Sequence, residues 1–189
     1  SSLVAPDELN GDLLLMESRT SVRRITCHLL EQGRTLPGFI GDISYAQSNR
    51  ERYEGFCQAL TDAGKKVDSS LCLTTPLGID TYREEIDTFL SSLSRMPDAF
   101  VCASDYVACI LMQLLEKRGL RVPEDVAVSG FDNNTEDLLA EHLTTVQVFN
   151  EELGARLALQ ILYRIKYPNT PYEITYLGTN VLYRDSTGD

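Results

Sequence analysis

Polar side chains follow three apolar segments of the sequence, at the points where strands of a parallel sheet would end. They are Tyr45, Ser48 and Arg52 after residues 38–41, Ser104 and Asp105 after residues 99–103, and Asp132 after residues 125–131. Ligands of open parallel sheets bind beyond the carboxyl ends of the strands, so these side chains are candidates for one binding site. A guanidinium, carboxylates and hydroxyls together suit a polyhydroxy or heterocyclic ligand. A phosphate fits poorly, because no glycine-rich loop precedes a helix with a lysine.

Residues suited to catalysis or metal binding are sparse. His28 falls in the middle of a predicted helix, and His142 has no nucleophile near it in the sequence. The chain contains no nucleophile elbow, phosphate-binding loop, dinucleotide fingerprint or zinc-protease motif. Its five cysteines form no C-x-x-C pair, and four have apolar neighbours, as buried reduced thiols of a cytosolic protein do. We therefore predict that the chain is not an enzyme and has no metal site and no cofactor.

The charge and hydropathy of the chain exclude further classes. Seventeen basic and 28 acidic residues give a net charge of −11. We expect no direct nucleic-acid binding by this chain, since phosphate contacts need clustered Lys and Arg. The longest apolar runs are far shorter than the ~20 residues of a membrane helix. The opening SSLVAPDELNGD lacks the pattern of a signal peptide, so we expect a cytoplasmic protein.

Two hydrophobic periods alternate along the chain. Helical spacing, ended by glycine or proline, predicts helices over residues 18–32, 50–63, 80–93, 105–118 and 151–167. Nearly continuous apolar runs predict strands over residues 38–41, 67–73, 99–103 and 125–131, with extended segments at residues 172–176 and 178–183. This alternation is typical of an α/β fold in which helices cover both faces of a parallel sheet.

Several segments resemble one known family. RERYEGFCQAL at residues 50–60, the block from PDAF to GFDN at 97–133, LTTVQ at 143–147, ELGARLALQIL at 152–162 and YRDST at 183–187 follow one another in order. Together they resemble the effector-binding core of LacI/GalR bacterial transcription regulators, which is similar to periplasmic sugar-binding proteins. The resemblance implies two Rossmann-like lobes with parallel sheets, of the periplasmic-binding-protein-like type I. It also implies a homodimer that binds operator DNA through an N-terminal helix-turn-helix domain.

The resemblance also indicates what this chain does not contain. The helix-turn-helix is absent, and the first lobe is incomplete, so we expect an N-terminally truncated fragment rather than a naturally short chain. We predict that residues 1–66 and about 148–170 form the remnant of the N-terminal lobe. Residues 67–147 and about 171–189 would form the C-terminal lobe. The polar segments around Asp68 and at residues 144–150 are the predicted crossings between the lobes.

The two strongest site predictions follow from the family motifs. Arg52 matches the arginine of the R-x-x-G-F segment, which hydrogen-bonds effector hydroxyls in sugar-responsive members, and its planar fork suits vicinal hydroxyls or a carboxylate. Asp132 matches the acidic residue that accepts from ligand hydroxyls or ring N–H groups. The alternatives are a solvated helix arginine and a helix N-cap. We expect Arg52 from one lobe and Asp132 from the other to meet at a shared ligand.

Four further residues are weaker candidates for ligand contact. Ser104 stands where many relatives have Asn and is shorter, so it would contact the ligand either directly or through a bridging water. Asp105 is a ligand group or a helix N-cap. Tyr45 and Ser48 lie in a loop that contacts the ligand in relatives, or else in a surface loop. The sequence departs from the family pattern at Val148, which is apolar where many relatives are polar, and this leaves the sugar unidentified.

The segment 105–118 has apolar residues on more than one helical face. One lobe covers about one stripe of a helix, so a second covering partner is expected. In the family the equivalent helix lies at the homodimer interface, which favours a dimer; the alternative is an unusually buried helix.

Two function classes besides the regulator core stay open from the sequence. A periplasmic sugar-binding carrier would have a signal peptide upstream, where a regulator would have a helix-turn-helix. An enzyme is the third class, and the paired glutamates at residues 84–85 and 151–152 are predicted to be solvated helix faces rather than acid–base pairs. A ligand-sensing regulator would act by closing a cleft between its lobes.

Overall fold

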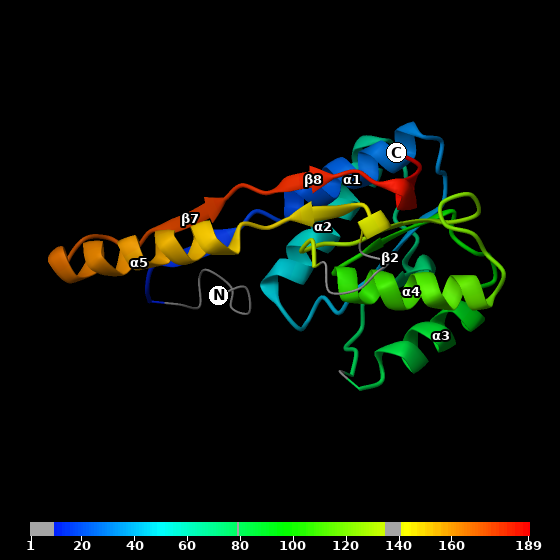
Figure 1. Ribbon diagram of the computed structural model, residues 1–189, viewed down its shortest axis with the longest axis horizontal. Helices are drawn as coiled ribbons and strands as arrows, with labels where there is room; N and C mark the ends of the chain where they lie inside the picture. The colour runs from blue at the N-terminus through cyan, green and yellow to red at the C-terminus, as the bar shows by residue number, and fades with distance from the viewer. Residues whose placement is uncertain (1–9, 79, 135–140) are drawn as a thin grey trace.

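The centre of the molecule is a four-stranded parallel sheet. The structure is a computed structural model that describes residues 10–78, 80–134 and 141–189. The strand order is β3 (Cys72–Leu73), β2 (Pro37–Ile40), β4 (Ala99–Cys102) and β5 (Ala127–Ser129). Figure 1 labels β2, one of the two central strands. Each pair is parallel. The predicted α/β class is therefore confirmed.

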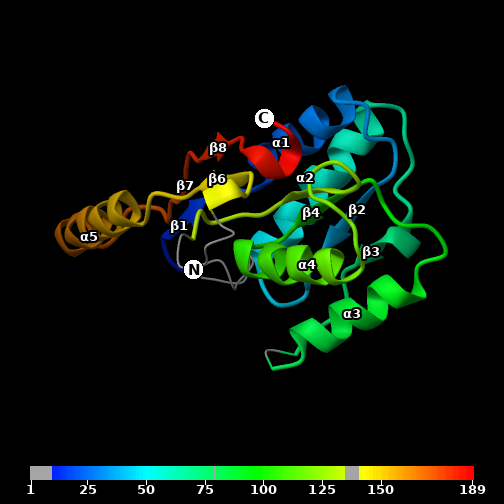
Figure 2. The same cartoon turned by 45° about the vertical axis from the view of Figure 1, so that its right-hand side comes forward.

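Helices cover both faces of this sheet. The helices α1 (Arg19–Glu31) and α2 (Gln47–Asp62) lie on one face, and α3 (Tyr82–Ser92) and α4 (Asp105–Lys117) on the other (Figure 2). Side chains alternate between the two faces along β4, where Val101 packs with the α1–α2 side and Phe100 with the α3–α4 side. Burial on both faces explains why the strand sequences are almost wholly apolar. We call this sheet with α1 to α4 the body.

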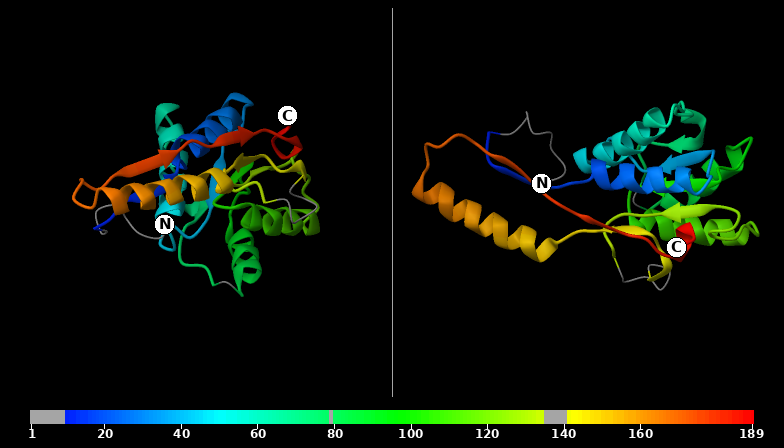
Figure 3. Two further views of the ribbon diagram at one scale, coloured as in Figure 1. Left: turned by 60° about the vertical axis from the view of Figure 1, so that its left-hand side comes forward. Right: turned by 90° about the horizontal axis from the view of Figure 1, so that it is seen from above.

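Three elements form an arm that extends from the body. Strand β1 (Leu13–Met16) pairs in parallel with β7 (Ile174–Leu177), and α5 (Asn150–Lys166) lies beside them, joined by an ion pair of Arg164 with Asp12. Figure 3 shows the arm projecting beyond the sheet and its helices. No residue of α5 is buried. The chain passes between body and arm after β1, before α5 and after β7.

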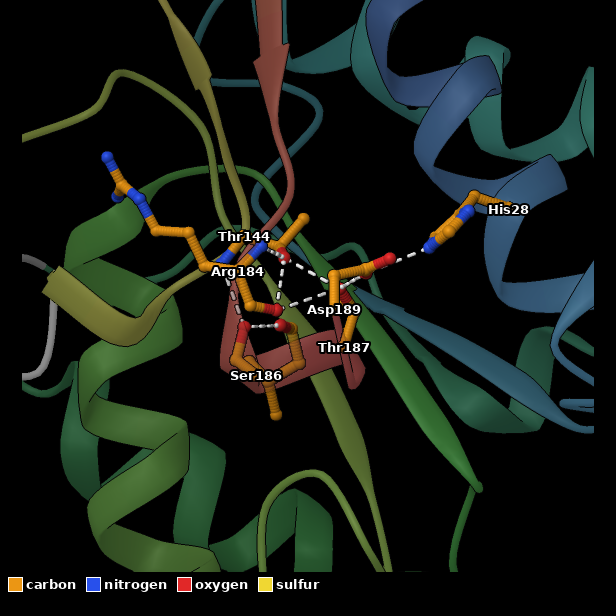
Figure 4. Close-up of polar contacts among 7 residues, drawn as sticks. His28, Thr144, Arg184, Ser186, Thr187 and Asp189 are labelled. Carbon is orange, nitrogen blue, oxygen red and sulfur yellow. Dashed lines mark hydrogen bonds and ion pairs between the residues drawn. The ribbon is translucent and has the colours of Figure 1, made fainter.

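The C-terminal segment returns to the body and packs against it. Strand β8 (Asn180–Leu182) pairs antiparallel with β6 (Thr145–Gln147), and a single 3-10 turn, η4 (Asp185–Thr187), follows. The Ser186 hydroxyl donates to the Val128 carbonyl over 2.6 Å and accepts from the Thr144 N–H over 2.8 Å. Figure 4 shows the polar contacts around this turn. They include the contact between His28 Nε2 and Asp189 Oδ2, which are 2.9 Å apart.

The sheet corrects the predicted boundary between lobes at residues 66 and 67. Strand β2 pairs with both β3 and β4, so residues on the two sides of that boundary belong to one sheet. Asp68 is not at a crossing, because its carboxylate accepts from the Ser70 N–H over 3.0 Å and caps the short turn η2 (Ser69–Leu71). That turn also shortens the strand predicted over residues 67–73. Residues 1–9 of the predicted first lobe lie outside the described part of the chain.

Helix α4 is covered by its own chain more fully than the sequence predicts. Tyr106 is exposed, but the apolar residues of several faces are each 6% exposed or less: Val107, Cys109, Ile110, Leu111, Leu114 and Leu115. They pack against the sheet and against α3, with Met112 partly buried at the edge. The expectation that these residues need a second covering partner is therefore wrong, and a dimer needs other support.

Candidate functional site

Helix α2 places Arg52 over the carboxyl ends of the central strands. Gly55 stands one turn later, and a Cβ at that position would lie 2.2 Å from the Arg19 carbonyl oxygen. The glycine of the R-x-x-G-F segment therefore allows α2 to pack closely against the start of α1. This close packing fixes the rotation of α2 and with it the direction of Arg52.

The Arg52 side chain is buried, at 10% exposed, and is held on several sides. Its Cζ lies 3.7 Å from the centroid of the Phe131 ring, and Nη1 donates to the Ala103 carbonyl. Nη2 lies 3.4 Å from Asp132 Oδ1, while the buried Nε has no acceptor. Burial lowers the pKa of Arg52, and the carboxylate of Asp132 opposes that shift. The guanidinium stays charged at neutral pH.

Asp132 occupies a backbone conformation that side-chain-bearing residues seldom adopt. Its φ is +108°, and its N–H donates to the Val146 carbonyl over 3.1 Å. Strained residues of this kind persist where the surrounding structure holds them, often at ligand sites. Burial raises the pKa of Asp132, and Arg52 opposes the shift. The acidic group is thus fixed beside the guanidinium by the backbone as well as by charge.

Asp105 lies behind this pair and does not line the cavity described below. Its Oδ1 accepts from the Thr145 hydroxyl over 2.6 Å and its Oδ2 from the Asn134 N–H over 2.7 Å. Gly130 leaves room for it, since a Cβ there would lie 2.2 Å from Oδ1. Burial raises the pKa of Asp105 to about 6. The helix N-cap is Ser104 instead, whose hydroxyl accepts from the Val107 N–H over 3.3 Å.

The loop between β2 and α2 is organised by Asp42. One carboxylate oxygen accepts from the N–H groups of Ser44 over 2.8 Å and Tyr45 over 3.1 Å, and the other accepts from the Leu77 N–H. Burial works against ionisation of Asp42, but these hydrogen bonds outweigh it and hold the pKa below its ordinary value. Tyr45 is 61% exposed and does not line the cavity, whereas Ser48, in the first turn of α2, does.

A cavity of about 220 Å³ lies where the arm joins the body. Its lining residues come from β1, the start of α2, the end of the sheet and the start of α5: Leu14, Leu15, Met16, Ser18, Gln47, Ser48, Glu51, Arg52, Asp132, Val148, Asn150 and Leu153. Three predicted site residues, Ser48, Arg52 and Asp132, therefore line one cavity. Arg52 and Asp132 both belong to the body, which corrects their expected origin in two different lobes.

Two residues that line the cavity, Glu51 and Gln47, were not predicted from the sequence. Glu51 is 7% exposed, and its Oε1 lies 3.4 Å from both Gln47 Nε2 and the Tyr176 hydroxyl of β7. The spacing holds a usable signal, since Gln47 and Glu51 are four residues apart, as are Ser48 and Arg52. Two neighbouring stripes at the start of one helix thus face the cavity. Val148, noted as a departure from the family pattern, also lines it.

The described residues include no cluster of three or more His, Cys, Asp or Glu placed to hold a metal ion. His28 and His142 pair with Asp189 and Asp185, away from the cavity. None of the described helices has the length and apolar character needed to cross a membrane.

Comparison with known proteins identifies the family. The family described as "Periplasmic binding protein-like domain" matches residues 26–187. The chain belongs to this family. It is 35% identical over 130 residues to the HTH-type transcriptional regulator DegA of Bacillus subtilis, covering 68% of this chain and 38% of that protein. It is 30% identical over 165 residues to the HTH-type transcriptional repressor PurR of Actinobacillus pleuropneumoniae, covering 87% and 49%. The chain spans about half or less of these relatives.

Solved structures of transcriptional regulators are also similar to this chain. A complex of the transcriptional regulator CelR with cellobiose is similar at a TM-score of 0.83 and 28% identity, over 93% of this chain and 54% of that one. A LacI-family structure from Sanguibacter keddieii is similar at a TM-score of 0.82 and 27% identity, over 94% and 67%. The resemblance to LacI-type regulators is confirmed. These relatives favour a regulator core over a periplasmic carrier.

Proposed function

We propose that this chain is the effector-binding core of a LacI-type transcriptional regulator and that the cavity beside Arg52 and Asp132 binds the effector. The observation that supports this most strongly is the pairing of the buried Arg52 with the half-buried Asp132, 3.4 Å apart, on the wall of a cavity. Burying a charged pair is costly and seldom adds stability. A pair that stays partly open to a cavity is instead placed to hydrogen-bond a ligand.

The effector is a small polar molecule, and a sugar fits the lining best. The guanidinium donates, the carboxylates accept, and Ser48 and Asn150 can do both, which matches the mixed demands of hydroxyl groups. The cavity is smaller than the ~300–1,000 Å³ usual for larger ligands. The related CelR holds cellobiose, which supports a sugar here. Ser104, Asp105 and Tyr45 act on the ligand only through neighbouring residues.

The effector acts by favouring one orientation of the arm relative to the body. The cavity wall includes Leu14 and Leu153 of the arm and Arg52 and Asp132 of the body. A ligand that touches both parts prefers one arrangement, and this preference shifts the population of states. Such couplings usually amount to about 1–3 kcal/mol. In the full-length protein, in the cytoplasm, this shift would change the affinity of the helix-turn-helix for operator DNA.

The regulator works as a homodimer. Two DNA-binding heads on one dimer read the two halves of an operator. Tyr106 of α4 is 60% exposed and stands edge-on to Tyr82 of α3, at a ring distance of 5.8 Å, so these aromatic side chains are the natural centre of the contact. Light scattering of the full-length protein should give twice the monomer mass, and Tyr106→Ser should lower that mass. A monomeric wild type contradicts the dimer.

The test of the function is operator binding by the full-length protein in the presence of a panel of neutral sugars. We expect at least one sugar to change operator affinity by fivefold or more, and Asp132→Asn to abolish the response while leaving basal operator affinity intact. Asp80→Asn, on the exposed surface, is the control and should respond like the wild type. If no sugar or other small polar ligand changes operator affinity, the regulator function is refuted.

A further inference from the structure

The charge of the cavity is not balanced. Its lining contains three ionisable side chains, Glu51, Arg52 and Asp132, so one cation faces two anions. Arg52 pairs with Asp132 at 3.4 Å. Glu51 has no cationic group within ion-pair distance among the described residues. The cavity therefore carries a net negative charge. Glu51 is 7% exposed and attracts Arg52 only from beyond ion-pair distance.

Glu51 is also incompletely hydrogen-bonded. Gln47 Nε2 and the Tyr176 hydroxyl both donate to Oε1, each over 3.4 Å, which is longer than a strong hydrogen bond to a carboxylate. No described residue donates a hydrogen bond to Oε2. This oxygen is nevertheless not closed off from solvent. An accessible acceptor oxygen on a mostly buried carboxylate is placed to receive a donor from a ligand.

We propose that Glu51 makes this cavity select ligands that bring hydrogen-bond donors, namely neutral polyols or polyols with an ammonium group, and reject phosphorylated or carboxylated ones. The proposal rests on the proposed function, which makes this cavity the effector site. An anionic group would meet the unpaired Glu51, while its natural partner Arg52 is already engaged by Asp132. Like charges at contact distance near a protein surface weaken binding by about 100-fold or more.

The experiment measures affinity of the full-length protein by calorimetry for matched trios built on one sugar ring. One trio is D-glucose, D-glucosamine and D-glucose 6-phosphate, and corresponding trios are built on galactose and mannose. Within a trio that binds, we expect the phosphate to bind at least 100-fold more weakly than the neutral sugar. The amino sugar should bind as tightly or more tightly. The ratio within one trio cancels the contribution of the ring itself.

The variant Glu51→Gln assigns the effect to this side chain. Glutamine keeps the shape and the acceptor oxygen but removes the charge, so the penalty against the phosphate should shrink about tenfold. Glu54→Gln is the matched control, because it removes the same charge from the same helix. Glu54 pairs with Arg19 outside the cavity, with 42% of its side chain exposed. This control should keep the wild-type ratio.

The outcomes separate the two proposals. A phosphate that binds the wild type as tightly as its neutral parent overturns the selectivity and leaves the effector site standing. Equal changes in Glu51→Gln and Glu54→Gln also overturn it, because the net charge of the protein would then be the cause. If no member of any trio binds, the proposed sugar site itself fails and the selectivity with it. Should Glu51→Gln not fold, the ratio within the wild type still decides.

Discussion

The guanidinium carbon of Arg52 lies 3.7 Å from the centroid of the Phe131 ring, so the only cation on the cavity wall in the described structure rests on an aromatic face. The Phe131 residue is fully buried and packs in the hydrophobic core on the α1–α2 side of the sheet. Arg52 also donates to the Ala103 carbonyl, at the end of β4. Ring and carbonyl together hold the guanidinium at a fixed place and angle before any ligand arrives.

This arrangement predicts that Arg52→Lys loses ligand affinity although it keeps the charge. Lysine has no planar fork, so it cannot stack on Phe131 and reach both Ala103 and Asp132. We expect affinity for the effector to fall about 10- to 100-fold, measured by calorimetry with the best ligand of the sugar panel. Arg50→Lys is the control, since Arg50 is exposed on the same helix. Near-wild-type binding by Arg52→Lys would show that charge alone matters there.

The sequence predicts the elements of this fold better than their order in the sheet. The helix predicted over residues 105–118 agrees with α4 (Asp105–Lys117) to one residue, because apolar spacing and a closing glycine are local signals. The position of β2 between β3 and β4 depends on pairing between residues 33 and 62 positions apart. No local pattern encodes that order, and the predicted lobe boundary at residue 66 is wrong for this reason.

The residues of the site also differ in how well the sequence predicts them. Arg52 and Asp132 were predicted from motif residues at strand ends, and the structure brings them together. Glu51 was missed because its burial depends on Tyr176, which comes 125 residues later in the arm. Asp105 was predicted to touch the ligand or cap a helix. Ser104 is the helix N-cap instead, and the Asp105 carboxylate does not line the cavity, because it is hydrogen-bonded to Thr145 and Asn134, which are distant in sequence.

Asp105 predicts a pH dependence of stability. Burial raises its pKa from the ordinary 3.8 to about 6, so the folded state holds this proton more tightly than the unfolded state does. The resulting stability is fully present below about pH 4 and is lost as pH rises through 6. The contribution of Asp105 to the free energy of unfolding should therefore fall by about 2 to 3 kcal/mol over this window, measured by urea denaturation with circular dichroism as the difference between the wild type and Asp105→Asn.

Asp105→Asn tests the assignment of this pH dependence. The amide can still accept from the Asn134 N–H and can donate to the Thr145 hydroxyl, so the variant should fold. It should show a flatter profile between pH 4 and 6, because the titrating group is gone. Asp80→Asn, at an exposed position, should keep the wild-type slope. An unchanged slope in Asp105→Asn would mean that another group titrates in this window.

The contacts of the C-terminal turn predict that Ser186→Ala is destabilising. The Ser186 hydroxyl is 2% exposed, donates to the Val128 carbonyl and accepts from the Thr144 N–H (Figure 4). Its loss leaves a buried N–H and a buried carbonyl without these partners, at a cost of about 1–3 kcal/mol. Urea denaturation measures the change. Ser92→Ala removes an exposed hydroxyl and should change stability by no more than about 0.5 kcal/mol.

The arm predicts that the 189-residue chain self-associates in solution. None of the α5 residues is buried, and six of its large apolar residues are 40% exposed or more: Leu157, Leu159, Ile161, Leu162, Tyr163 and Ile165. An apolar surface of this extent drives association unless it is covered. The double variant Leu159→Glu/Ile165→Glu should therefore shift light-scattering mass toward the monomer and reduce binding of the dye ANS. Ser92→Glu adds charge on the exposed end of α3 and should leave the mass unchanged. A wild-type chain that is monomeric at high concentration would show that the exposed face of α5 does not drive association.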